Sequence, residues 1–196
     1  MVAMTIPDVW QDPNRLLTVD DLADINDLMG NDDHRLELDD GILIVSPFAA
    51  NIHQLVVTRL MMILGQASPQ NLVVLPGVGM NISRFQHRIP DVAVVDASSF
   101  DTLYQEQPPA LAIEVSSPST RIYDRNRKKD VYEGFGIPSY WIVEPDRDSP
   151  RLIVFELSDG KYEQIADVSG DEQFRAARPF PVTIRPSALV RTGPLD

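Results

Sequence analysis

Residues 110–116, ALAIEVS, form a short apolar run that contains one acid, Glu114. No other charged residue lies within five positions of Glu114 on either side. A short apolar run of this kind is typical of a buried strand. Because burying an isolated carboxylate costs several kcal/mol, such a strand is stable only if something pairs with the charge. The chain is therefore expected to bring a distant partner to this acid.

The first third of the chain predicts an arm, two helices and a hairpin. Thr18 is a suitable N-cap for a short helix, since two aspartates follow in the first turn. Asp40-Gly41, between two alternating runs, predicts a type I′ hairpin over residues 34–47. Apolar residues at helical spacing predict a helix over residues 51–66. Residues 1–17 are expected to form an irregular arm.

The rest of the chain combines strand-like runs with one further helix. That helix is expected over residues 119–136, where Gly134 or Gly136 ends it and Pro138 follows. Prolines between residues 179 and 194 favour loops and edges in the tail. This order predicts a mixed β-sheet flanked by helices, in α/β or α+β form. The strand-like runs are residues 71–75, 78–82, 91–96, 110–116, 139–145, 151–157 and 161–168.

Composition narrows the class of protein. With 196 residues and 43% hydrophobic content, the chain suits one core, and we expect a single domain over residues 18–196. No apolar stretch approaches the roughly 20 residues of a membrane span, and no secretory signal is recognisable. The chain has no cysteine, which excludes disulfides and thiolate sites and suits a reducing cytosol. A cytoplasmic protein without membrane association is expected.

Charge is unevenly distributed. The net charge of −12 argues against a generic binder of polyanions, and the first forty residues hold eleven acids against two arginines. In contrast, residues 121–129 contain five of the 17 basic residues. Arg121 and Arg125 in this segment could contact phosphate, although from charge alone a solvated helix face is the better explanation.

Three acids and one lysine form the candidate site. Asp91 opens one strand-like run and Glu114 lies in the next, so pairing in register would place both carboxylates at one edge of the sheet. Two carboxylates with carbonyl oxygens and water suit Mg²⁺, and Mn²⁺ is possible. Lys128 would then orient a water or neutralise charge, and Glu37 would assist at the metal. The simpler alternatives are a turn residue for Asp91, a structural ion pair for Glu114, and exposed positions for Glu37 and Lys128.

Several motifs in a fixed order give the chain a specific resemblance. Together they resemble the Uma-two family of restriction-endonuclease-like proteins, a branch of the PD-(D/E)xK nuclease superfamily. The resemblance covers most of the chain, from about residue 18 to residue 145. The motifs are ELDDG (37–41), SP (46–47) with His53, PDVAVV (90–95), EVSSPST (114–120), YDRNRK (123–128), Tyr132 and YWIVEP (140–145).

The resemblance implies a restriction-endonuclease-like mixed sheet with an N-terminal hairpin extension, and a metal-dependent DNA endonuclease that forms a homodimer. In the superfamily the lysine stands two residues after the acid, where this chain has Ser116. The narrower resemblance implies that the lysine has moved to Lys128. Lys129 would point about 100° away around the helix. His53 is expected to be structural or to lie beside the substrate.

Two alternatives remain open at this point. The chain could be a binding or assembly module that keeps the nuclease-like fold without turnover, as its acidity and the lack of a separate DNA-recognition domain suggest. It could also bind a basic partner protein through its acidic first forty residues.

Overall fold

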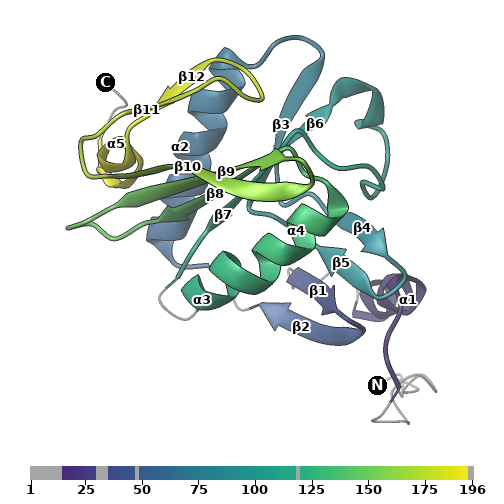
Figure 1. Ribbon diagram of the computed structural model, residues 1–196. Coiled ribbons are helices and arrows are strands. Elements are labelled where there is room, and N and C mark those ends of the chain that lie inside the picture. Colours follow the sequence, from purple (N-terminus) through teal and green to yellow (C-terminus); the bar gives the residue numbers. More distant parts are fainter. Residues whose placement is uncertain (1–14, 30–34, 47–48, 118–119, 194–196) are drawn as a thin grey trace. The chain divides into compact units, whose positions relative to one another are not determined.

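The computed structural model describes residues 15–29, 35–46, 49–117 and 120–193. The chain divides into two compact units, which are described separately below (Figure 1). The smaller unit contains the described residues up to 46 together with residues 79–89, and the larger contains residues 49–78 and those from 90 onward. Most of the expected N-terminal arm lies outside the described residues, and the single domain over residues 18–196 stays a prediction.

The smaller unit is a four-stranded antiparallel sheet with one helix. Leu22 and Ile25 of the helix pack with Leu36 and Leu38 of the sheet in a small apolar cluster. The strand order is β2-β1-β5-β4. The elements are α1 (Val19–Met29), β1 (Arg35–Asp39), β2 (Ile42–Ser46), β4 (Met80–Ser83) and β5 (Gln86–Arg88).

The predicted N-cap and hairpin are both present in this unit. The Asp21 amide donates to the Thr18 hydroxyl at 3.3 Å, at the start of α1. Between β1 and β2, Asp40 has φ 49° and Gly41 has φ 80°, as a type I′ turn requires. A Cβ at Gly41 would lie 2.7 Å from the Cβ of Leu16, so space as well as backbone angle demands glycine there.

The larger unit contains the mixed sheet that the sequence predicted. Its strand order is β10-β9-β8-β7-β6-β3, and only β7 and β8 are parallel to one another within it. A parallel pair needs a crossover connection, which here is helical. The strands are β3 (Leu72–Pro76), β6 (Val92–Asp96), β7 (Leu111–Val115), β8 (Ser139–Glu144), β9 (Arg151–Ser158) and β10 (Lys161–Ser169).

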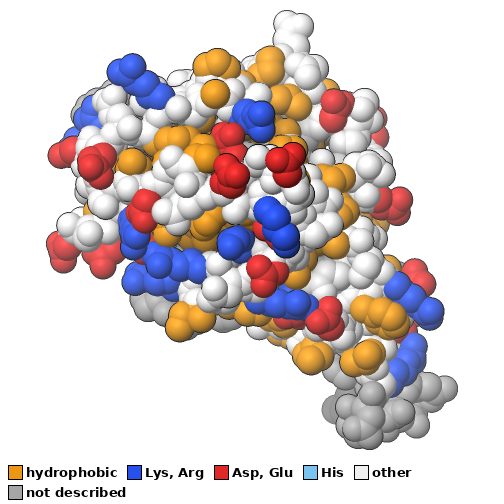
Figure 2. Space-filling model, in the orientation of Figure 1, with side chains coloured by type: hydrophobic (Ala, Val, Ile, Leu, Met, Phe, Trp, Pro, Cys, Tyr) orange, Lys and Arg blue, Asp and Glu red, His pale blue; other side chains and the backbone are white. Residues whose placement is uncertain are grey.

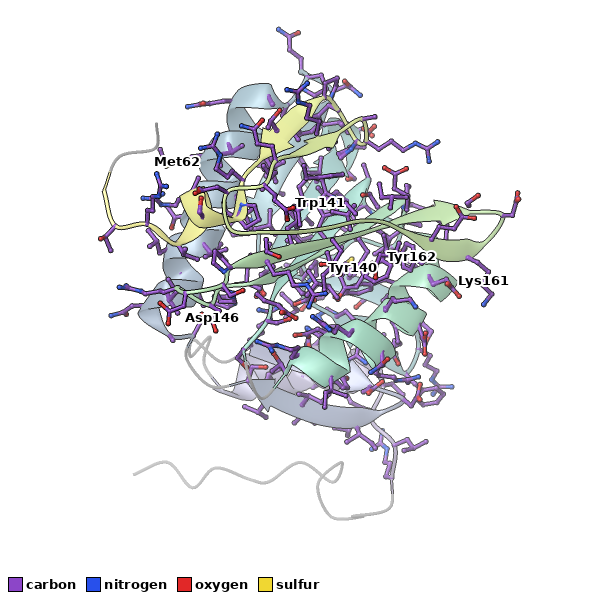
Figure 3. The ribbon with its side chains drawn as sticks, turned by 60° about the vertical axis from the view of Figure 1, so that its left-hand side comes forward. Met62, Tyr140, Trp141, Asp146, Lys161 and Tyr162 are labelled. Atoms are coloured by element: carbon purple, nitrogen blue, oxygen red, sulfur yellow. The ribbon has the colours of Figure 1, made fainter. Side chains whose placement is uncertain are left out.

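The two faces of this sheet carry different side chains. One face packs against α2 (Asn51–Ala67) and contributes Ile113 and Trp141 to the main apolar core. Because side chains alternate along a strand, Glu114 and Tyr140 belong to the other face. Figure 3 shows Tyr140 and its neighbour Trp141 inside the sheet region, and both are fully buried.

The crossover between β7 and β8 is one helical stretch with an unusual middle. It consists of α3 (Arg121–Tyr123), a π-helical segment η3 (Asp124–Lys128) and α4 (Lys129–Phe135). Gly136 ends it in the left-handed conformation, with φ 89°. The helix predicted over residues 119–136 is thus confirmed for residues 121–135, whereas residue 119 lies outside the described part. Isolated π turns are frequently found at functional sites.

The proline-rich tail contains more regular structure than the sequence suggested. The tail contains the antiparallel pair β11 (Phe174–Ala176) and β12 (Val182–Ile184), followed by α5 (Pro186–Val190). A short 3₁₀ turn, η2 (Ala97–Ser99), occurs earlier in the chain, directly after β6. Ile184 and Leu189 are fully buried in the main core. Pro179 and Pro181 lie between β11 and β12, and Pro186 begins α5, which is why composition alone favoured loops.

β10 is an edge strand of nine residues with an irregular middle. Its register against β9 shifts between Gln164 and Ala166, so Ile165 forms a β-bulge. Among the described residues, no helix is both long and apolar enough to cross a membrane.

Candidate functional site

Glu114 has the distant partner that its sequence environment demanded. Its carboxylate is buried, and Lys128 Nζ lies 2.9 Å from Oε2. The hydroxyl of Tyr132 donates to the other oxygen, Oε1, at 2.6 Å. Both partners come from the helical crossover that follows the strand of Glu114. Hydrogen bonds and an opposite charge together offset the cost of burying this carboxylate.

Asp91 lies across the strand pair from Glu114. Val92 pairs with Ile113 in the antiparallel register of β6 and β7, and continuing it by one residue sets Asp91 opposite Glu114. Residues directly opposite each other in such a pair project from the same face of the sheet. The Asp91 carboxylate is buried and accepts the amide hydrogen of Val115 at 2.7 Å. The expected juxtaposition of the two strands is therefore present.

His53 contacts the carboxylate of Asp91. Its Nε2 lies 3.1 Å from Asp91 Oδ2, and the residue stands in the first turn of α2. Its Nδ1 is buried and has no hydrogen-bond partner among the described residues. His53, expected to be structural or to lie beside the substrate, thus contacts a candidate metal ligand.

Lys128 has a second acidic neighbour on its own helix. Nζ lies 3.7 Å from Oδ1 of Asp124, whose side chain is also buried. Lys129 turns elsewhere, because its Nζ lies 5.3 Å from the ring centroid of Phe155. The geometry therefore distinguishes the two adjacent lysines as the helical spacing predicted.

Asp124 is itself held from the strand side. The hydroxyl of Ser116 donates to Asp124 Oδ2 at 2.8 Å, and the hydroxyl of Tyr140 donates to the Asp124 carbonyl at 2.9 Å. Burial raises the pKa of Tyr140 well above its ordinary value, and the charges of Glu114 and Asp124 raise it further. Tyr140 consequently stays protonated and remains a donor.

These contacts form one polar cluster on the face of the sheet that the helical crossover covers. Comparisons with known proteins give the family of the chain. A model of the Uma2 family, described as "Putative restriction endonuclease", matches residues 20–189. The chain belongs to this family. No curated protein matches the chain.

A solved structure supports the fold of this Uma2 family member. It is "a putative nuclease belonging to DUF820 from Anabaena variabilis ATCC 29413", with a TM-score of 0.65 at 15% sequence identity. The likeness covers 83% of this chain and 89% of that chain. At this identity the comparison shows the fold alone, which is the nuclease-like fold expected from the sequence motifs.

The arginines of the basic segment have an acidic partner that the sequence did not reveal. Arg125 Nη2 binds Glu144 Oε1, and Arg121 Nε lies 3.4 Å from the same oxygen. Glu144 ends β8 and is buried. On the face shown in Figure 2, basic and acidic side chains are interspersed. Any contact of Arg121 and Arg125 with phosphate would therefore use the donors that Glu144 does not occupy.

Glu37 belongs to the smaller unit and has partners there. Its Oε1 accepts the amide hydrogen of Ile89 at 2.8 Å and lies 3.8 Å from Arg35 Nη2. Arg88 Nη1 lies 3.8 Å from Oε2. Glu37 is buried rather than exposed, so the default expectation for an alternating strand is wrong. Its part at a metal stays a prediction.

The carboxylate oxygens of the cluster fit a hard divalent ion that needs only one or two ligands from the protein. Among the described residues, no group of three or more His, Cys, Asp or Glu side chains is placed to hold a metal. Mg²⁺ does not require one, because it keeps several waters and is commonly held by one or two carboxylates plus substrate phosphate. Asp91 and Glu114, opposite each other on neighbouring strands, supply two carboxylates.

Two members of the cluster carry roles that sequence reasoning did not assign. In the sequence, Ser116 marks only the place where the superfamily has its lysine, and Asp124 is only one residue of the motif YDRNRK (123–128). The available signal was the spacing from Glu114 to Ser116, because residues two apart on a strand share a face. Nothing in the sequence alone could link Ser116 to Asp124.

Proposed function

We propose that this protein is a metal-dependent DNA endonuclease that hydrolyses phosphodiester bonds. The observation that carries the proposal is the contact of Lys128 with Glu114, on a strand whose neighbour brings Asp91 opposite. An acid from each of two paired strands and an ammonium group from the adjoining helix supply the charges that phosphodiester hydrolysis needs. Membership of a family described as "Putative restriction endonuclease" supports the same reaction class.

Asp91 and Glu114 would hold the divalent cation, Mg²⁺ or Mn²⁺. Such an ion supplies Lewis-acid stabilisation of phosphate charge and lowers the pKa of water that it binds. His53 and the Val115 amide orient the carboxylate of Asp91, and Tyr132 orients that of Glu114. Orientation of ligands by neighbouring donors typically affects metal affinity or activity by 10- to 100-fold.

Lys128 would orient the attacking water and neutralise charge that develops on the phosphate. Its ammonium group carries three donors and lies 2.9 Å from Oε2 of Glu114, beside the proposed metal ligand. The preorganised charge of Lys128 is effective because its ammonium group is largely excluded from bulk water.

DNA is proposed as the substrate on the strength of the family. The net charge of −12 gives little general attraction for DNA, so local contacts must carry the binding. Arg121 and Arg125 would contact the phosphate backbone, and a homodimer would set two such basic helices side by side. A cytoplasmic location accords with the lack of cysteine.

The experiment is a cleavage assay on supercoiled plasmid and on labelled single- and double-stranded oligonucleotides, with Mg²⁺, Mn²⁺ or EDTA. Glu114→Gln, Asp91→Asn and Lys128→Met should each reduce cleavage by at least about 10²-fold. Lys129→Met and Glu163→Gln are matched controls, since both remove exposed or ring-bound charges elsewhere, and cleavage should persist. Unchanged cleavage by Glu114→Gln would reject the site, and cleavage in EDTA would reject the metal.

A binding module without turnover is the second candidate function. It is favoured by the pairing of Arg121 and Arg125 with Glu144, which reduces the charge that these arginines present to DNA. Isothermal calorimetry with Mg²⁺ and Mn²⁺ separates the two. A folded protein that binds neither ion and cleaves no substrate would favour the module.

A further inference from the structure

We propose that Asp124, held in place by Ser116, is a positioning residue that keeps Lys128 aimed at the site. The proposal rests on the function proposed above, because it concerns the lysine of the same cluster. It assigns to Ser116 a new task at the place where the wider superfamily has its lysine.

The first support is the position of Asp124 between strand and helix. Its side chain is only 4% exposed, one oxygen accepts the Ser116 hydroxyl at 2.8 Å, and the other lies 3.7 Å from Lys128 Nζ. The Tyr140 hydroxyl fixes the main chain of the same residue. A buried carboxylate with two defined neighbours has a well-determined direction, unlike a carboxylate at the surface.

The second support is the way Ser116 is fixed. It follows Glu114 by two residues, so both side chains project from the same face of the strand. Its amide donates to the carbonyl of Val143 at 2.8 Å, which extends the pairing of β7 with β8 by one step. Ser116 therefore ties Asp124 to the same rigid strand that carries the proposed metal ligand Glu114.

The third support is the competing demand on Glu114. Its carboxylate would have to serve the divalent ion and the ammonium group together. With Glu114 as its single anion, the long lysine side chain would be displaced as the ion binds, since like charges repel at short range. Asp124 supplies a second carboxylate, so the ammonium group stays buried at the site when Glu114 turns to the ion.

The local backbone favours this arrangement. Asp124 and Lys128 are the first and last residues of the π-helical segment η3, and both are buried. Pairs four residues apart share a helix face, and the wider π turn alters how their side chains align. The segment brings both side chains toward β7, whereas Arg125 points to Glu144 at the end of β8.

The test uses the small number of lysines in the chain. There are three, Lys128, Lys129 and Lys161, so ¹⁵N-lysine labelling gives side-chain Nζ signals that single Lys→Arg variants can assign. In the metal-free wild type, the buried Lys128 signal should be visible through slow hydrogen exchange. Lys161, at the outer end of the β9–β10 hairpin with 81% of its side chain exposed, is the exchanging reference (Figure 3).

The decisive step is addition of Ca²⁺ or Mg²⁺ to wild type and to Asp124→Asn. Asparagine keeps an acceptor for Ser116 but removes the charge facing Lys128. In wild type the Lys128 signal should shift and remain sharp, whereas in Asp124→Asn it should broaden beyond detection on ion binding. Ser116→Ala should show the same loss in weaker form, and Ser116→Thr, which retains the hydroxyl, should restore the wild-type behaviour.

Kinetics give the second readout. Asp124→Asn should lower kcat by about 10- to 100-fold through misplacement of the ammonium group, while KM for DNA stays within about twofold. A Lys128 signal that responds to the ion identically in wild type and Asp124→Asn would overturn the positioning role, as would an unchanged kcat. If neither the wild type nor any variant cleaves DNA, the proposed function fails. The Nζ spectra still decide whether Asp124 holds Lys128.

Discussion

Replacement of Lys128 by methionine removes one buried cation and leaves two buried carboxylates behind. Lys128 Nζ lies 2.9 Å from Glu114 and 3.7 Å from Asp124, and the three side chains are 9%, 3% and 4% exposed. Removal of one partner from a buried ion pair typically costs 3–5 kcal/mol, because the remaining charge has lost its compensation. For Lys128→Met we expect a loss of about 3–5 kcal/mol in unfolding free energy.

Glu114→Ala should cost less than Lys128→Met. The ammonium group then still faces Asp124, so we expect about 1–3 kcal/mol, below the usual range for an unpaired charge. From the sequence alone, loss of an isolated buried acid is expected to leave thermal unfolding unchanged or improved. The pairing with Lys128 changes that expectation to a destabilisation.

The double variant Lys128→Met/Glu114→Gln tests whether the uncompensated charge of Glu114 causes the loss. Glutamine retains an acceptor for Tyr132 without a charge, so the double variant should recover about 2 kcal/mol relative to Lys128→Met alone. A loss of 3 kcal/mol corresponds to a Tm decrease of about 6–12 °C for a chain of this size. Both changes are large enough to measure without ambiguity.

The assay is urea unfolding in EDTA at pH 7.5, followed by circular dichroism and tryptophan fluorescence. Equal m-values across the variants are required for the comparison. Lys129→Met is the matched control and should stay within about 1 kcal/mol of wild type. The reasoning would be refuted if Lys128→Met unfolded with wild-type free energy, or if Glu114→Ala cost more than Lys128→Met.

Three further predictions concern other parts of the chain. The pKa of His87 is lowered to about 4, chiefly by burial, so the unfolded chain alone binds this proton between pH 6.5 and 4. The contribution of neutral His87 to the unfolding free energy should therefore be complete above pH 6.5 and should fall by up to about 3 kcal/mol toward pH 4. Urea titrations at each pH measure this dependence, and His87→Gln should flatten it. Gly41→Ala should destabilise the protein by more than about 1 kcal/mol, because a Cβ there would meet Leu16 at 2.7 Å; an unchanged Tm would contradict this. Arg121→Gln/Arg125→Gln should reduce the slope of log K for DNA against log salt by about 2, measured by fluorescence anisotropy, and an unchanged slope would exclude both from the phosphate contacts.

The sequence predicted the parts of the fold that depend on local pattern. The turn at Asp40-Gly41, the N-cap at Thr18 and the apolar strand around Glu114 follow from residues close together in the chain. The sequence did not predict β5, because its three residues are polar and its burial depends on tertiary ion pairs. Arg88, for example, is fully buried with Nη2 placed 2.6 Å from Asp39.

Some contacts of the candidate site could likewise be predicted from the sequence, and others could not. The pairing of Glu114 with Lys128 could be anticipated because a solitary acid in an apolar strand requires a cation and the motif order indicates which one. The contacts of Asp91 with His53, and of Arg125 with Glu144, join segments far apart in the chain. Their existence depends on the exact register of strands and rotation of helices, which periodicity does not determine.

The bulge in β10 has a consequence for how the protein behaves in concentrated solution. A straight nine-residue edge would offer its unpaired amides and carbonyls to another chain, whereas the extra residue at Ile165 interrupts that ladder and twists it. Lys161 and Glu163 add charges along the same margin. Deleting Ile165 would straighten the margin and leave the cluster around Glu114 untouched, so samples would aggregate on storage while the freshly purified protein kept the contacts of Glu114 with Lys128 and Tyr132.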